Sequence, residues 1–428
     1  MPLQLGIARE IITPEIGGFL FGYNNHTQSD KVNDDLTVIA MVLKSQNTYA
    51  MLISVTVCLM HEELIDEICK KASDVTGVPA SNIVISCTHT HSAPRCTFFP
   101  QFTNFGDMDR KYCDTILIPK CIAAAQNAAA QMQTVKMGVG TTQSLTGINR
   151  RQLHRDGSVS LGQNPWDTYD STMTVISFTN GDKAIANIVH VGAHLTAAGN
   201  NTEITRDWAG VMVDRLEAES GAMTMFINGA QGDIAPRMAN GDSVGNLQHA
   251  MEVGGLAGID AVRAYRTIRT FYDEPLEIAH GNLTLPYKPP IALDKVQAIL
   301  DSSEYMSGFK TSSLNTLAQM YESGDLGEDE WQARQVVIRI GPVVFVPFPF
   351  EVSSEISIRL RTYSPLAHTL LLACTNGSNS YLPAQSQLCR GGYEVESFLW
   401  FRPRQLPDDS DTQLIEQNVQ LIEKMVTA

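Results

Sequence analysis

The sequence of 428 residues lacks several patterns that define common functional classes. Its eight cysteines form no Cys-X-X-Cys pair, so zinc-ribbon and thioredoxin-like sites have no support. It also contains no Gly-X-Ser-X-Gly elbow, no Walker loop and no Gly-X-Gly-X-X-Gly motif. A serine hydrolase of the α/β-hydrolase type and a nucleotide-binding enzyme therefore have no support either.

Positive charge and long apolar runs are scarce. The chain has 31 Lys and Arg residues against 46 Asp and Glu residues, a formal net charge of −15 at pH 7. Nucleic acids and anionic membranes both attract a basic surface, so we expect neither as a partner. No apolar run reaches the roughly 18 residues of a spanning helix, and residues 1–6 show no signal-peptide pattern. We therefore expect a cytoplasmic protein with reduced thiols and no stable membrane association; the oligomeric state stays open.

Strand-like and helical patterns alternate along the chain, whose 43% hydrophobic content is enough for a large core. A strand at residues 49–56, a helix at 61–72 and a strand that begins at residue 82 and runs into two histidines predict a βαβ-type unit. Residues 335–346 are typical of one strand, and the acidic, helical residues 291–330 of a peripheral insertion. We predict one α/β domain over residues 1–428, without an internal repeat.

Two histidines follow a buried strand in the segment Thr88-His89-Thr90-His91-Ser92-Ala93-Pro94. In an extended chain alternate side chains share a face, so His89 and His91 should lie side by side. Imidazole is the commonest neutral metal ligand and a general acid or base near neutral pH. The pair thus predicts a metal or catalytic site, with two hydrogen-bonded structural histidines as the alternative.

Other polar residues come at or just after the ends of predicted buried strands: His194, Asp233, Glu351 and Tyr381. Loops at this edge of an α/β sheet are where ligands usually bind. Histidines plus a carboxylate form a zinc-type catalytic set with one position open for water, suited to amide or ester hydrolysis. Arg150, in a polar loop at residues 147–151, could stabilise the developing oxyanion.

The sequence also resembles the catalytic domain of neutral (non-lysosomal) ceramidases, zinc amidases that cleave ceramide to sphingosine and fatty acid. Six short motifs occur in the family's order along nearly the whole chain. They are Thr88-His89-Thr90-His91-Ser92-Ala93-Pro94 for Thr-His-Thr-His-Ser-Gly-Pro, Asn149-Arg150 for Asn-Arg-Ser, His194-Leu195-Thr196 for His-Pro-Thr, Gly232-Asp233-Ile234-Ala235-Pro236 for Gly-Asp-Val-Ser-Pro, Pro349-Phe350-Glu351-Val352 for Pro-Gly-Glu-Phe, and Tyr381 with Tyr393-Glu394 for a paired-tyrosine segment.

This resemblance implies a fold, a metal and a set of roles. The fold is α/β, with a mixed β-sheet core covered by helices. The metal is Zn²⁺, and its implied ligands are His89, His194, Glu351 and Tyr381. The groups implied around the scissile carbonyl, as acid–base or oxyanion groups, are His91, Arg150 and Tyr393.

Ala235 stands where the family has its active-site serine, so a step that needs that hydroxyl is absent. A metal-bound hydroxide could still attack the substrate. We therefore predict a zinc-dependent hydrolase of the carbon–nitrogen amide bond in a small, soluble substrate. The alternatives are an ester hydrolase on the same site, a TIM-barrel amidohydrolase with its strand-end His-X-His, and an inactive homologue that binds a ligand.

Overall fold

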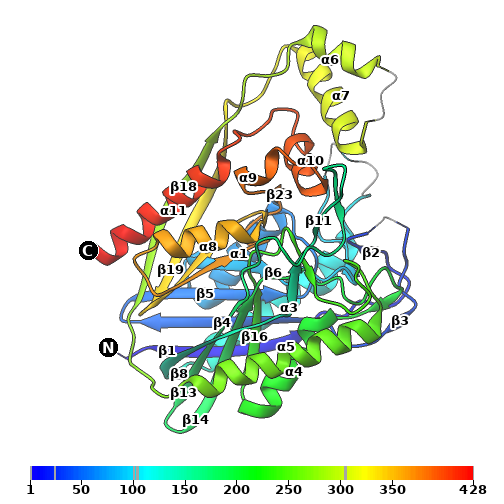
Figure 1. Cartoon of the computed structure of the whole chain (residues 1–428). Coiled ribbons are helices and arrows are strands. Elements are labelled where there is room, and N and C mark those ends of the chain that lie inside the picture. Colours follow the sequence, from blue (N-terminus) through cyan, green and yellow to red (C-terminus); the bar gives the residue numbers. More distant parts are fainter. Residues whose placement is uncertain (1, 24–25, 100–101, 103–105, 303–305, 428) are drawn as a thin grey trace.

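The computed structural model describes residues 2–427, except residues 24–25, 100–101, 103–105 and 303–305 (Figure 1). Its architecture is α/β, with mixed sheets covered by helices, which confirms the predicted fold class. The larger sheets are the five-stranded β6-β5-β4-β1-β8 and the four-stranded β16-β14-β13-β9 and β18-β19-β20-β22.

All strands of the first of these sheets except the short β8 (Gln133–Thr134) belong to a segment, residues 4–130, that we call unit 1. Three antiparallel strands come first: β1 (Gln4–Ile11), β4 (Thr37–Ser45) and β5 (Thr48–Val55). Helix α1 (Glu62–Thr76) then crosses to β6 (Ile83–Cys87), which is parallel to β5. A second long helix, α3 (Ile118–Ala130), ends the unit.

The same order occurs twice more. Unit 2, residues 136–267, contains β9 (Lys136–Gln143), β13 (Thr172–Asn180), β14 (Lys183–Val191), α4 (Asp207–Ser220), β16 (Met223–Asn228) and α5 (Leu247–Thr267). Unit 3, residues 276–427, contains β18 (Leu276–Pro286), β19 (Glu330–Ile340), β20 (Val343–Pro347), α8 (Ser354–Tyr363), β22 (His368–Leu372) and α11 (Ser410–Thr427). In both, three antiparallel strands precede a helix and a parallel strand, as in unit 1.

The topology repeats although the sequence shows no repeated motif, because the pattern of pairings recurs while the side chains differ. One expectation from the sequence was wrong. Residues 335–346 form parts of two strands, β19 and β20. The chain reverses between them at Gly341, whose φ of 53° is one that glycine adopts without strain.

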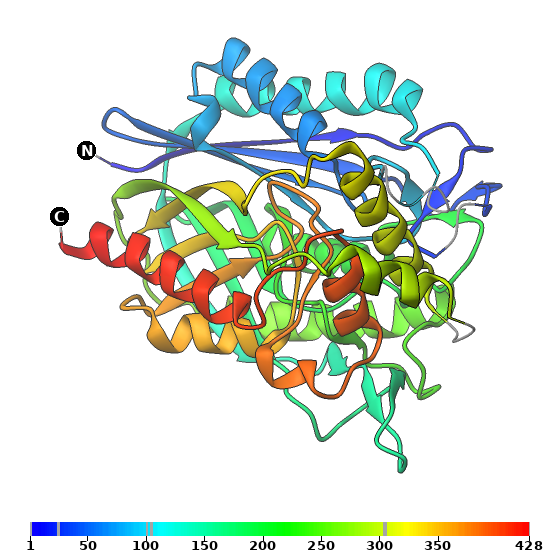
Figure 2. The ribbon, with the colours of Figure 1, turned by 90° about the horizontal axis from the view of Figure 1, so that it is seen from above.

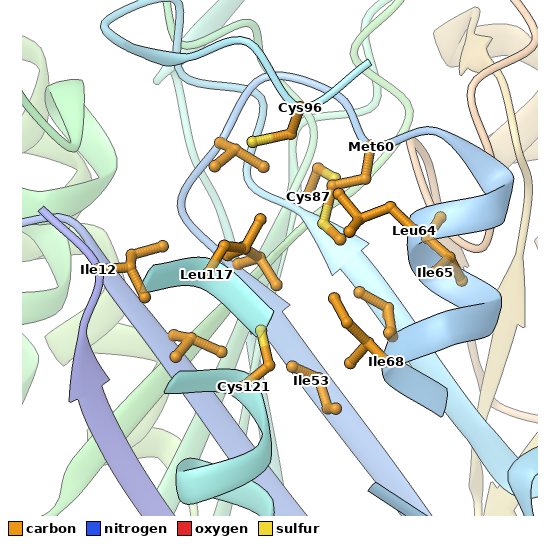
Figure 3. Close-up of a cluster of buried hydrophobic side chains, with 14 of the residues drawn as sticks. Ile12, Ile53, Met60, Leu64, Ile65, Ile68, Cys87, Cys96, Leu117 and Cys121 are labelled. Carbon is orange, nitrogen blue, oxygen red and sulfur yellow. The ribbon is translucent and has the colours of Figure 1, made fainter. Parts of the chain in front are cut away.

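Each unit places its two helices on the outer face of its sheet. In unit 1 the stripe that predicted a helix, Leu64, Ile65, Ile68 and Cys69, is buried in a core with Ile53 and Cys121. Figure 3 shows Leu64, Ile65 and Ile68 pointing from α1 into this core. Figure 2 shows α1 and α3 side by side along one edge of the molecule. Equivalent cores lie under α4 with α5 and under α8 with α11.

The inner faces of the three sheets share one further core. Met41 of unit 1, Phe178 of unit 2 and Phe345 of unit 3 are all fully buried in it. Burying each such side chain stabilises the fold by about 1.5–3 kcal/mol. The three sheets are thereby fixed against one another, and so are the loops that leave their strands.

The residues predicted as a helical insertion contain α6 (Leu293–Leu300) and α7 (Gly308–Ser323), while residues 303–305 lie outside the described part. Figure 1 shows both helices beyond the ends of β18 and β19, far from the two termini. Among the described helices, none has the length and apolar character needed to cross a lipid bilayer.

Candidate metal centre

Loops from the three units meet at one buried point. His89 follows β6 of unit 1, His194 follows β14 of unit 2, and Glu351 follows β20 of unit 3. One ligand atom from each residue lies within 4.8 Å of the other two. Oε2 of Glu351 is 3.1 Å from Nε2 of His194 and 3.3 Å from Nε2 of His89. Each unit thus contributes one donor to a compact set.

Backbone carbonyl groups orient both imidazoles. Nδ1 of His89 is 3.0 Å from the carbonyl oxygen of Cys58, and Nδ1 of His194 is 2.7 Å from that of Gln231. A carbonyl only accepts hydrogen bonds, so each Nδ1 carries a proton and each Nε2 faces Glu351. Burial and the charge of Arg150 also lower the pKa of His194 to about 4, which keeps this ring neutral and suits a metal ligand. Burial lowers the pKa of His89 as well, but Cys374 and Glu351 outweigh it and raise this pKa well above its usual range, so a metal at Nε2 of His89 would displace a proton.

The His-X-His pair does not extend the strand, contrary to the expected alternation. Strand β6 ends at Cys87, and His89 has a φ of 73°, a left-handed conformation that is rare for residues with a side chain. Such strain costs about 1–3 kcal/mol and is concentrated at functional sites. The turn still brings Nε2 of His91 to 3.4 Å from Nε2 of His89.

Tyr381 lies beside Glu351 because β23 (Tyr381–Leu382) pairs in parallel with β21 (Glu351–Val352). Its hydroxyl is 3.4 Å from Nε2 of His194. Arg150 donates a hydrogen bond of 3.0 Å from Nη2 to the same hydroxyl. The predicted oxyanion group and the fourth implied ligand are thus in direct contact.

Glu394 holds Arg150 in place, a role that the sequence did not indicate. Its two carboxylate oxygens accept 2.8 Å hydrogen bonds from Nε of Arg150 and Nη1 of Arg151. Burial raises the pKa of Glu394, but the two arginines outweigh it and lower the net value. Because 244 residues separate Glu394 from Arg150, no local pattern could have revealed this contact.

His91 and Tyr393 stand around this set. Burial, with His89 and His194 nearby, holds the pKa of His91 well below its usual range, so its ring is neutral. A Cβ on Gly22 would collide with this ring, so the glycine leaves room for it. Tyr393, the first residue of α10 (Tyr393–Trp400), is 40% exposed, and its ring centroid lies 5.4 Å from that of Tyr381.

A pocket of about 290 Å³ opens onto these groups. Its lining includes His89, His91, Arg150, Glu351, Tyr381 and Tyr393. It also includes large apolar side chains, which we call the apolar wall: Phe21, Leu59, Phe99, Phe309 and Phe401. Phe309 comes from α7, so the helical segment at residues 291–330 reaches the pocket.

Asp233 and Ala235 lie behind the centre. The Asp233 carboxylate accepts hydrogen bonds from the backbone of Ser354 at 2.8 Å and from the side chains of Gln387 at 2.7 Å and Asn149 at 3.3 Å. It therefore holds loops together and is not a member of the donor cluster. Ala235 is fully buried in β17 (Ile234–Pro236), which pairs with β10 (Gly147–Asn149) in the segment predicted as a loop.

The family described as "Neutral/alkaline non-lysosomal ceramidase, N-terminal" matches residues 3–251, more than half of the chain. The chain belongs to this ceramidase family. No protein with a curated description gives a significant match. Glu351 and Tyr381 lie beyond the matched residues, in unit 3.

Solved structures of ceramidases cover the rest of the chain. Neutral ceramidase from Pseudomonas aeruginosa is similar over 99% of this chain and 75% of its own, with a TM-score of 0.76 and 16% identity. A ceramidase complexed with C2 is similar over 100% of this chain and 76% of its own, with a TM-score of 0.77 and 15% identity. At this identity the likeness establishes the fold, including the strands that carry Glu351 and Tyr381.

Proposed function

We propose that this ceramidase-family protein is a zinc-dependent hydrolase that cleaves the amide bond of a small, soluble substrate. The observation that carries the proposal is the meeting of His89, His194 and Glu351, one from each unit, with ligand atoms within 4.8 Å of one another. Three residues so far apart in sequence, buried together and opening onto a pocket, are typical of a catalytic metal site.

The donor set fits zinc. Two imidazoles and a carboxylate are a common catalytic zinc set, and the Tyr381 hydroxyl lies close enough to be a fourth donor. When bound, Zn²⁺ would polarise a substrate carbonyl and lower the pKa of a coordinated water. Cellular supply also affects which metal occupies such a site, and iron or manganese are the alternatives to zinc.

The surrounding residues would supply proton transfer and charge stabilisation. His91 is neutral and faces the pocket, so it can accept a proton from the attacking water and donate it to the leaving amine. The Arg150 guanidinium and the Tyr393 hydroxyl would donate hydrogen bonds to the oxyanion. Glu394 fixes the orientation of Arg150 through Nε, while Nη2 of the same guanidinium donates to the Tyr381 hydroxyl beside the pocket.

The pocket favours an uncharged substrate with an apolar arm. Among its described lining residues, the charged side chains are Arg150 and Glu351, and both already have partners within the site. A charged arm would therefore lose hydration without gaining a partner. A cytoplasmic location remains part of the proposal, supported by the cysteine usage alone.

The test is hydrolysis of N-acyl amides and the matching esters by metal-loaded protein, with His89→Ala as the control. We expect amide cleavage that follows metal content and is absent in the variant. Preference for the esters would favour the ester-hydrolase alternative. If zinc-loaded protein binds amides without cleaving them, the protein is an inactive binder, the alternative that Ala235 favours.

A further inference from the structure

The repeated topology points to Cys58. His194 follows Val191, the last residue of β14, at the same interval as Cys58 follows Val55, the last residue of β5. Glu351 leaves the equivalent strand β20 of unit 3. Cys58 is therefore the unit 1 counterpart of two members of the candidate metal centre, although no motif marks it.

The geometry around Cys58 is that of a second donor set. Its Sγ, one ring nitrogen of His89 and one of His91 all lie within 4.8 Å of one another. Sγ is 3.6 Å from Nδ1 of His89, and Cys58 lines the pocket from which an ion would enter. To bind a cation beside Sγ, this nitrogen would give up its proton and its hydrogen bond to the Cys58 carbonyl. Nδ1 of His91 is buried and has no hydrogen-bond partner, so the ring can reorient without breaking a bond there.

We propose that Cys58, His89 and His91 form a second site, for a soft cation, that competes with the catalytic metal. A thiolate with imidazoles prefers Zn²⁺, Cd²⁺ or Cu⁺ over hard cations, whereas the Glu351 set offers no sulfur. On binding, the S–H bond of Cys58 is replaced by a metal–sulfur bond, and the proton is released to water.

The two sites exclude each other because they share His89. A neutral imidazole has one lone-pair nitrogen, so His89 serves one cation at a time. A cation on the thiol set also occupies His91, the proposed proton acceptor. Soft cations in excess would thus inhibit the protein, through residues that are separate from His194 and Glu351.

The experiment is a Cd²⁺ titration of the full-length, metal-free protein, followed by thiolate-to-metal charge-transfer absorption. We expect the absorption to saturate at one equivalent of Cd²⁺ in the wild type and in Glu351→Gln. It should be absent in Cys58→Ser, whose apparent Cd²⁺ affinity falls at least tenfold at this site. It should weaken in His91→Ala. Because the readout is spectroscopic, it does not depend on whether an amide is hydrolysed.

Two other cysteines are matched controls. Sγ of Cys374 is also near Nδ1 of His89, at 3.7 Å, but it accepts a hydrogen bond from Gln231 and is not a member of the donor set. Cys389 is exposed and distant in sequence. Cys374→Ser and Cys389→Ser should both keep the band. The second site does not exist if Cys58→Ser keeps the charge-transfer band and has an unchanged unfolding transition. The same conclusion follows if either control variant loses the band.

Discussion

Arg150 donates a 3.0 Å hydrogen bond to the hydroxyl of Tyr381, which itself lies 3.4 Å from Nε2 of His194. A residue of unit 2 thus bonds to one of unit 3 at the edge of the candidate metal centre. The contact has a consequence for charge. A bound cation would favour the negatively charged form of the Tyr381 hydroxyl, and Arg150 is placed to stabilise that charge as well as an oxyanion.

Glu351→Gln should remove the metal. An amide oxygen is a weaker ligand than a carboxylate, and the substitution also removes the charge that faces His89 and His194. We expect zinc affinity to fall at least about 100-fold, measured by competition with a chelator. Glu355→Gln, four residues further along in α8, is the control and should bind zinc like the wild type. Retention of stoichiometric zinc by Glu351→Gln would contradict the assignment.

His91→Ala should separate metal binding from turnover. His91 stands outside the cluster of His89, His194 and Glu351, so zinc content should be unchanged. Losing a general acid–base group typically slows a reaction about 10²–10⁴-fold. Steady-state rates and metal analysis on the same sample test this, with His154→Ala at an exposed position as the control. A variant with the full rate would show that His91 has no catalytic role.

Glu394→Ala should destabilise the fold. Arg150 and Arg151 are buried and would lose the carboxylate that neutralises them. Removing one partner of a buried ion pair typically lowers the free energy of unfolding by about 3–5 kcal/mol. Urea unfolding would measure this loss. Glu396→Ala in the same helix has no such partner among the described ion pairs and should change stability little. If the free energy of unfolding of Glu394→Ala falls by less than about 1 kcal/mol, the ion pair of Glu394 with the two arginines has no structural role.

Asp233 should contribute a pH dependence of stability. Burial raises its pKa from 3.8 to about 6, so between these values the folded state holds a proton that the unfolded state has lost. The contribution of this group to the free energy of unfolding is fully present below pH 4. It falls by about 3 kcal/mol as the pH rises to 6. The stability difference between wild type and Asp233→Asn should shift by that amount between pH 4 and 7. A constant difference would show that the pKa of Asp233 is ordinary.

Phe309→Ala should lengthen the apolar arm that the pocket accepts. The Phe309 ring centroid lies 5.1 Å from that of Phe102 and 6.2 Å from that of Tyr393, so it closes the wall between them. Each further methylene that is buried in the space left by Phe309 should raise the affinity of the inhibitor about fourfold. Inhibition by carboxylic acids of increasing length measures this. Leu317→Ala, which loosens the core of α7 without lining the pocket, should leave the length preference unchanged.

Much of the chemistry could be predicted from the sequence. Local spacing predicted α1, and the position of His89, His194 and Glu351 after buried strands predicted that they would converge. They do meet, but they come from three sheets and not from neighbouring strands at one edge of a single sheet. This works because a strand is a local pattern, and the carboxyl ends of parallel strands are where loops with ligands gather. The resemblance to ceramidases added Tyr393 and gave Tyr381 the role of a ligand, and the structure places both side chains and Arg150 at the same pocket.

Only the tertiary structure showed how these loops come to meet. The threefold topology arises from hydrogen bonds between strands, and sequences with different side chains can form the same pairings. The left-handed turn at His89 and the Glu394–Arg150 pair depend in the same way on segments far apart in the chain. The sequence by itself determined which side chains could act as ligands. The packing of three sheets on one core decided which of them share a centre, because distances between remote residues are not encoded locally.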